Sequence, residues 1–164
     1  MTTTGVWRGR WRLALAAAAF FVIPMFGGRL IDNARIDQWR NRGFAAEEPR
    51  VWWSQGIATA SEAVLWRADG FAAADAGAWK KMEFISLDAR AWREAGFDLL
   101  SAAEWRRAAF DPVTAAAWRA EAFSIGEATA WRKRAFAPAD AVAWKRAGRS
   151  PIEAAEARAA ARER

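Results

Sequence analysis

A tryptophan that recurs at a fixed spacing of 13 dominates this sequence. Seven Trp residues keep the spacing without interruption, and a Phe follows each of the first six by five positions. Ala stands three positions before each of these Trp residues, and Arg or Lys follows each at once. A fixed period of this kind is typical of repeat architectures, in which each unit is one small structural element. The series consists of Trp66, Trp79, Trp92, Trp105, Trp118, Trp131 and Trp144.

The same pattern continues, less regularly, at both ends of the series. WRNRGF occurs at Trp39, and Trp52 lies 13 residues beyond it, but the step from Trp52 to Trp66 is 14, which is one inserted residue. Beyond Trp144, the positions expected to hold Phe and Trp are occupied by Arg149 and Ala157. Because repeat arrays need a polar terminal unit for solubility, residues 150–164 are predicted to form a capping helix.

Each unit carries the signals of one short helix followed by a turn. Ser or Thr with Glu three residues later forms a capping box, and Pro at the first helical position or Gly after the last one marks the ends. The capping boxes are Thr59 with Glu62, Ser124 with Glu127, and Ser150 with Glu153. The period predicts helices near residues 60–69, 73–82, 86–95, 99–108, 112–121, 125–134 and 138–147.

Ala and Trp at i and i+3 share one face of each predicted helix. Ala allows close approach of a neighbouring helix, and Trp fills the space beside it. One unit buries too little apolar area to offset the conformational entropy that its own ordering costs, so neighbouring units must stack. The sequence therefore predicts an all-α solenoid whose core is the Trp series, after a single transmembrane helix at the N-terminus.

That membrane helix is predicted at residues 13–31. Leu13 to Gly28 contains no charged residue, which is close to the length needed to span a bilayer. The preceding tail is basic, and Trp7 and Trp11 flank the span where indole rings favour the membrane interface. Pro24 is expected to kink this helix.

The same segment also fits two other interpretations. A secretory signal peptide has a similar layout, but cleavage after the Gly pair at 27–28 would place Met25 or Phe26 where a small residue is needed. A buried helix of a globular domain is disfavoured because the run is apolar on all sides. We therefore expect an uncleaved signal anchor.

The expected organisation has four parts: a basic tail with its anchor (1–31), a linker helix with divergent repeats (32–58), regular repeats (59–149) and the capping helix (150–164). Arginines on the two sides of the span are too balanced to decide orientation, but the short basic tail favours a cytoplasmic N-terminus. Richness in Ala and Arg indicates a GC-rich bacterial gene. The expected location is thus a bacterial inner membrane, with the repeats in the periplasm.

Composition excludes several kinds of chemistry. The chain contains no His and no Cys, which removes disulfides, Cys/His zinc sites and His- or Cys-based catalysis. Acidic residues such as Asp75, Asp88, Glu127 and Asp140 stand at helix N-termini, where the helix dipole accounts for them. We therefore expect no enzyme activity, no metal and no cofactor.

The Trp series and the cations beside it could also form a ligand-binding face. Exposed Trp rings stack on sugars or on single-stranded nucleic acid, but the helical spacing favours a core role. The Arg or Lys after each Trp is interpreted as a solvated face, because residues 51–164 carry a net charge of only +2. Six Lys and Arg residues within 132–149 form a basic patch that could meet an anionic partner or lipid headgroups, although a solvated end of the array is favoured.

Trp53 departs from the pattern, because it occupies the position that is Arg or Lys in the regular units. Two adjacent helical residues point about 100° apart, so Trp52 and Trp53 cannot enter the same seam. Trp53 is then either exposed for a partner or membrane contact, or buried in a local core by the rotation that the inserted residue causes. With Trp7 and Trp11, it is the candidate contact residue.

These features favour a membrane-anchored scaffold or accessory subunit that acts through protein–protein contacts. Its expected partners are other protein subunits, embedded in the membrane, and the lipid bilayer. A cell-envelope module that binds glycan or peptidoglycan through exposed Trp is the alternative. Nucleic-acid binding is a third possibility that the charge distribution disfavours, so no nucleic-acid partner is expected.

Overall fold

The computed structural model describes residues 33–163. Within that range all regular secondary structure is helical, and there is no strand. None of the helices in these residues is both long enough and apolar enough to cross a bilayer. The predicted anchor at 13–31, together with Trp7 and Trp11, lies outside the described residues.

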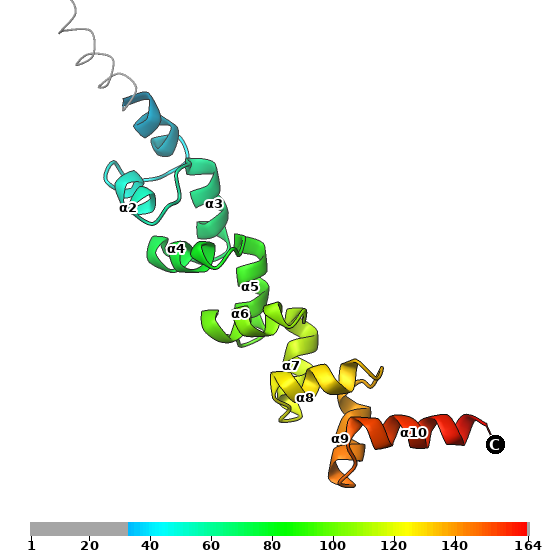
Figure 1. Cartoon of the computed structure of the whole chain (residues 1–164). Helices are drawn as coiled ribbons and strands as arrows, with labels where there is room; N and C mark the ends of the chain where they lie inside the picture. The colour runs from blue at the N-terminus through cyan, green and yellow to red at the C-terminus, as the bar shows by residue number, and fades with distance from the viewer. Residues whose placement is uncertain (1–32, 164) are drawn as a thin grey trace, which may run out of the picture. The chain divides into compact units, whose positions relative to one another are not determined.

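The helices follow the predicted period closely (Figure 1). Residues 33–40 are helical, and the labelled elements come after them. All seven helices predicted from the Trp series begin at the predicted residue and end within two residues of the predicted end. The elements are α2 (Glu48–Ser54), α3 (Ala60–Ala68), α4 (Ala73–Lys81), α5 (Ser86–Glu94), α6 (Leu99–Arg107), α7 (Pro112–Ala120), α8 (Ile125–Arg132), α9 (Pro138–Arg146) and α10 (Pro151–Arg162).

The chain divides into two compact units between Val64 and Leu65. In the first unit, the rings of Trp39 and Phe44 meet edge to face at 4.9 Å, and Phe44 meets Trp52 at 6.0 Å. These rings and Ile57 are buried. The divergent repeats therefore build their core from the same positions as the regular ones, with Ile57 at the Phe position.

In the second unit the helices change direction from one to the next (Figure 1), and α4 packs on α5, α5 on α6, α6 on α7, and α9 on α10. Each Trp from Trp66 to Trp131 meets the Phe of its own turn edge to face, at 4.9–5.2 Å. The Ala three residues before each Trp is completely buried. A side chain larger than Ala at that position would push the helices apart, which explains why Ala holds it in all seven regular units.

Each regular helix ends in a Schellman motif. In the turn after α3, the Phe71 N–H donates to the Trp66 carbonyl and the Gly70 N–H to the Arg67 carbonyl, and the same pair recurs after every helix through α9. The residue before the Phe position has positive φ throughout. The turn is predictable from the sequence where this residue is Gly, but not at Glu83, Ala109, Ala122 and Ala135, whose φ angles are 56–62°.

Helix beginnings also match the sequence signals. Ser124 with Glu127 and Ser150 with Glu153 form complete capping boxes, and the Thr59 hydroxyl accepts from the Glu62 N–H. Asp98 and Asp111 cap α6 and α7 through their carboxylates. The final helix, α10, is the longest of the labelled helices.

Candidate protein-interaction surface

From Arg93 onward, the cation after each Trp binds the helix end two repeats earlier. Arg93 donates from Nη1 to the Gly70 carbonyl at 3.0 Å and from Nη2 to the Asp69 carbonyl at 2.7 Å. Its guanidinium carbon lies 4.0 Å from the centre of the Phe71 ring. A helix end leaves carbonyls without intrahelical partners, so this guanidinium satisfies two of them and stacks on the adjacent ring.

The arrangement recurs at every later repeat, and we call it the arginine clasp. Its members are Arg93, Arg106, Arg119, Arg132, Lys145 and Arg158, each bound 23 or 24 residues earlier in the chain. Lys145 makes one such bond, at 3.4 Å, where the arginines make two. Arg93, Arg119 and Lys145 are exposed, as the interpretation of a solvated face expects. That interpretation missed their second role, which is to join repeats n and n+2.

Arg158 was missed as a member of the row because Ala157 replaces the Trp before it. Its place one full repeat after Lys145 was the signal that could have found it. Arg158 donates to the Arg134 and Ala135 carbonyls and lies 3.8 Å from the Phe136 ring. The helix α10 therefore retains the repeat register although it lacks both large aromatic residues.

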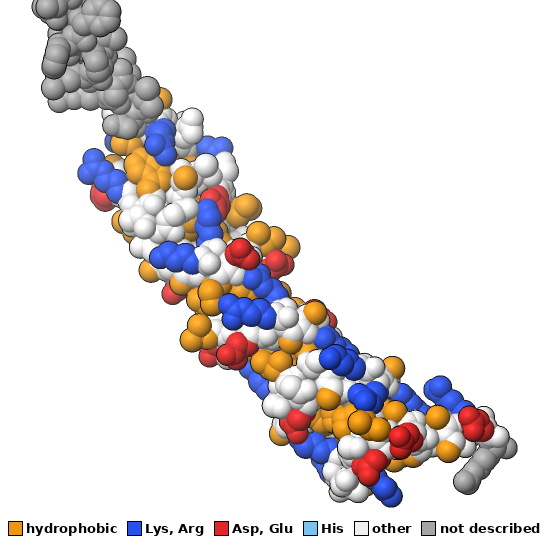
Figure 2. Space-filling view, in the orientation of Figure 1, with side chains coloured by type: hydrophobic (Ala, Val, Ile, Leu, Met, Phe, Trp, Pro, Cys, Tyr) orange, Lys and Arg blue, Asp and Glu red, His pale blue; other side chains and the backbone are white. Residues whose placement is uncertain are grey.

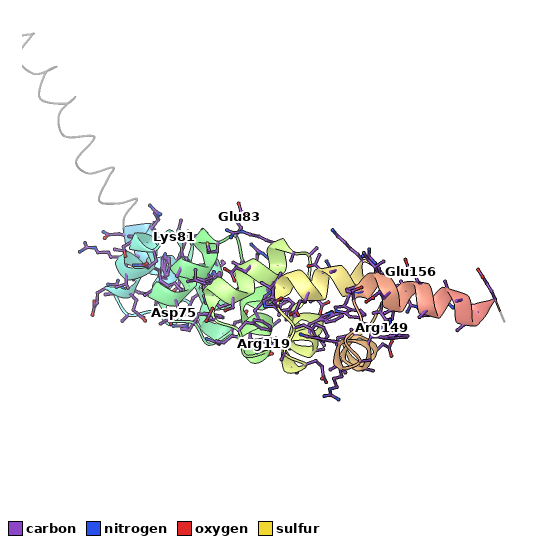
Figure 3. All side chains as sticks on the ribbon, turned by 60° about the horizontal axis from the view of Figure 1, so that its bottom comes forward. Asp75, Lys81, Glu83, Arg119, Arg149 and Glu156 are labelled. Atoms are coloured by element: carbon purple, nitrogen blue, oxygen red, sulfur yellow. The ribbon has the colours of Figure 1, made fainter. Side chains whose placement is uncertain are left out.

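Because each clasp joins repeats n and n+2, the turns of the second unit form two rows. The turns after α4, α6 and α8 lie in one row and those after α3, α5 and α7 in the other. In Figure 3, Lys81, Glu83 and Glu156, from α4, its turn and α10, lie along one edge of the unit. Arg119 and Arg149, from α7 and the turn after α9, lie along the opposite edge. The surface therefore repeats at every second unit rather than at every unit.

Open hollows lie beside equivalent clasps on the two edges. One hollow of about 200 Å³ is lined by Lys81, Met82, Glu83, Ala103, Arg106 and Arg107. Another, of about 400 Å³, is lined by Ala120, Glu121, Ala122, Val142, Lys145 and Arg146. The residues occupy the same repeat positions in both, so the two hollows differ only in the side chains that line them.

The Trp residues assigned to the repeat core are buried, with one exception. Trp66, Trp79, Trp92, Trp105, Trp118 and Trp131 expose between 1 and 7% of their surface. Trp144 is only half-buried, although the Phe136 ring lies 6.5 Å from it. Its own turn holds Arg149 instead of Phe, and a hollow of about 340 Å³ lined in part by Trp144, Phe136 and Arg158 stays open.

Trp53 is half-buried in the first unit. Its ring meets Trp39 edge to face at 5.9 Å, and the Arg35 guanidinium lies 4.7 Å from its centre. The indole N–H donates to the carbonyl of Ala58 at 3.2 Å, in the turn lengthened by one residue. These contacts are those expected of a local core under the preceding helix, and a partner contact at Trp53 stays a prediction.

Some acidic side chains at the helix N-termini act as caps, whereas α4, α5 and α9, which carry Asp75, Asp88 and Asp140 in their first turns, have no side-chain cap hydrogen bond. Hydrogen bonds from Lys145, and then from Ser124, lower the pKa of Glu127 from 4.5 to about 2. Bonds from the Thr114 hydroxyl and N–H lower the pKa of Asp111. Within residues 33–163, Asp and Glu residues form no group that could hold a metal ion.

The basic patch expected within 132–149 is dispersed in the structure. Arg132 and Lys145 are clasps on opposite edges, and Arg149 lies 4.0 Å from the Glu153 carboxylate. Lys133 and Arg134 follow α8 in one row, whereas Arg146 ends α9 in the other. A cluster in the sequence thus becomes two separate sets of cations.

Comparison with known proteins adds no family to this description: no family model, curated protein or solved structure matches the chain.

Proposed function

We propose that this chain is a membrane-anchored scaffold protein or accessory subunit, whose short helical units form a solenoid that binds other proteins. The observation that carries the proposal is that the recurring side chains of the array all have structural roles inside it. Trp, Phe and Ala form the core, the clasps join the repeats, and the carboxylates cap helices. What the unit offers to other molecules is then its long repeated surface, and solenoids bind through such surfaces.

The buried Trp rings bear on the alternative functions. Stacking on a glycan or on nucleic-acid bases needs an exposed aromatic face. Six of the seven Trp residues in the series expose 7% of their surface or less. This burial favours protein partners over a glycan or nucleic acid.

The proposal is tested on the full chain, expressed in bacterial cells and extracted in mild detergent. Chemical cross-linking before extraction, followed by mass spectrometry, should give cross-links to a membrane protein from exposed lysines of the array, either Lys81 and Lys133 on one edge or Lys145 on the other. A matched sample of the Trp105→Ala variant, in which the array is destabilised, should lose these cross-links. Cross-links that persist in this variant, or their complete absence in the parent chain, would contradict a scaffold role.

Attachment to the membrane is tested separately. We expect the intact chain, with residues 13–31, in the membrane fraction after washing at high salt. A mature N-terminus near residue 29 in the soluble fraction would overturn the anchor. Steep loss of binding to single-stranded DNA with rising salt, measured on the same preparation, would instead favour nucleic-acid binding.

A further inference from the structure

Four cations lie in the row of turns that follow α4, α6 and α8: Lys81, Arg107, Lys133 and Arg134. We call this row the basic edge. Arg106 binds the Met82 and Glu83 carbonyls, which places its neighbour Arg107 beside the turn that follows Lys81. Arg132 binds the Ala108 and Ala109 carbonyls, which likewise places Lys133 beside the turn that follows Arg107. Successive clasps therefore hold the four cations in one continuous row.

The cations of the basic edge differ from those of the opposite edge in their ion pairs with carboxylates. Among the described residues, none of the four makes an ion pair with a carboxylate. On the opposite edge, Arg90 pairs with Asp69 at 2.8 Å and with Glu94 at 3.5 Å. Lys145 pairs with Glu127 at 2.9 Å. Arg90, Lys145 and, at 4.0 Å, Arg149 on that edge therefore have carboxylate partners. Among the described residues, Arg146 on that edge and the four cations of the basic edge have none.

Carboxylates also stand in this row. Glu83 lies in the first turn, and Glu104 and Glu156 stand one residue before the Trp position on α6 and α10. Asp88, Asp111 and Asp140 stand at the beginnings of α5, α7 and α9, which follow the three turns, and Asp111 is engaged as the cap of α7. Lys81, Arg107 and Lys133 are exposed, and the clasp cations Arg106, Arg132 and Arg158 add further positive charge along the row. Figure 2 shows Lys and Arg side chains recurring along one face of the second unit, with hydrophobic and acidic side chains between them.

We infer that the basic edge binds an extended acidic segment of a partner protein. Carboxylates form short, charge-assisted hydrogen bonds with Arg and Lys, and the open hollow between Lys81 and Arg107 leaves room for one. An extended chain matches a row of cations that repeats at one fixed step. Nucleic acid is disfavoured because no aromatic ladder is exposed in the described repeats. This inference rests on the proposed function and names the chemistry of the partner.

The test compares two double variants with the same net charge. Lys81→Glu with Lys133→Glu reverses two charges on the basic edge. Arg146→Glu with Arg149→Glu reverses two on the opposite edge. Neither pair includes a clasp, and circular dichroism checks that both variants keep their helix content. The probe is a fluorescent peptide of alternating Glu and Ala, titrated against the purified full chain in detergent at low and at physiological salt.

We expect the basic-edge variant to bind the peptide about tenfold more weakly, with a flatter salt dependence, and the control variant to bind nearly as well as the parent chain. Equal weakening in both variants would mean that only net charge matters and would overturn the inference. The inference would also be overturned if the parent chain did not bind the peptide. It would be overturned too if the basic edge bound phosphatidylglycerol vesicles and not the peptide. If cross-linking finds a partner away from this edge, the scaffold function stands and the inference fails. If no protein partner exists, the proposed function fails whatever the peptide does.

Discussion

At the scale of single residues, the clasp arginine accounts for more of the architecture than its exposure indicates. Arg132 donates to the Ala109 and Ala108 carbonyls, both at 2.6 Å, and its guanidinium carbon lies 3.8 Å from the Phe110 ring. The planar fork reaches both carbonyls at once, which a lysine ammonium does less well. Lys145 illustrates the difference with its single bond of 3.4 Å.

Two substitutions of the clasp Arg132 should therefore separate the contribution of its charge to stability from that of its two-carbonyl hydrogen bonding. Arg132→Met keeps the aliphatic stem but loses both hydrogen bonds, so we expect it to cost about 2 kcal/mol of unfolding free energy. Arg132→Lys keeps the charge and should cost about half as much. Urea denaturation followed by circular dichroism measures both. Equal losses in the two variants would mean that the two-carbonyl geometry contributes nothing.

The residue with positive φ before each Phe position gives a second prediction. Ala109 holds φ 59°, a conformation that a Cβ disfavours by about 1 kcal/mol, so Ala109→Gly should raise the unfolding free energy by about that amount. At Gly96 an added Cβ would also come within 3.1 Å of Nη2 of the clasp Arg119, so Gly96→Ala should destabilise. Thermal melts of the two variants should shift in opposite directions, and a shift of both in the same direction would refute this account.

At the scale of helices, acidic caps make the array sensitive to acid. The pKa of Glu127 is about 2 when folded, below its ordinary 4.5, because Lys145 and Ser124 bind the carboxylate. A group with a lowered folded pKa stabilises the fold fully above its ordinary pKa and loses that contribution as pH falls toward the folded value. The stabilisation from Glu127 should thus disappear between about pH 5 and pH 2.

Glu127→Gln isolates this contribution from the other caps. We expect the parent chain to melt at a higher temperature than the variant at pH 7, and the difference to shrink as pH falls below 4.5. Caps such as Asp98 and Asp111 titrate in both chains, so their effects cancel in the comparison. A difference in melting temperature that stays constant from pH 7 to pH 2 would contradict the cap assignment.

The last helices allow a prediction about packing. Ala157 occupies a Trp position, and its neighbour Arg158 lines the open hollow at Trp144 together with Phe136. A Trp there should fill the hollow and cover Trp144, as the internal repeats do. We therefore expect Ala157→Trp to raise the melting temperature and shift Trp fluorescence to shorter wavelength. Ala161→Trp serves as a control for the added ring, and an equal effect in both would contradict a specific fit.

At the scale of the whole molecule, stability is shared between neighbours. Trp105 lies within the array and exposes 5% of its surface, and its ring contacts both Phe97 and Phe110. Truncating a buried aromatic costs about 3–5 kcal/mol, so Trp105→Ala should lose that much. Because repeats stabilise each other through their interfaces, hydrogen exchange should accelerate in α5 and α7 as well as in α6. Faster exchange confined to α6 would show that each repeat is stable independently.

The sequence alone determined the helices, their starting residues and their core. Ala and Trp at i and i+3, the capping boxes and the fixed Trp period are local patterns, and local hydrogen bonds and helix geometry decide what they form. Trp118 and Ala115 could be assigned to the core because their spacing places them on one helix face. The turns at Gly70 and Gly96 were predictable because only Gly adopts positive φ without strain.

Only the tertiary structure decided what the remaining residues do. A clasp such as Arg106 joins groups 23 and 24 residues apart, and a pattern that repeats in every unit does not say which repeat lies within reach. Turns at Ala109 and Ala122 carry no Gly, since the packing of the following Phe imposes their conformation. The two edges arise in the same way: alternating helices share one sequence motif, and their stacking places Lys81 and Lys133 in one row and Arg146 in the other.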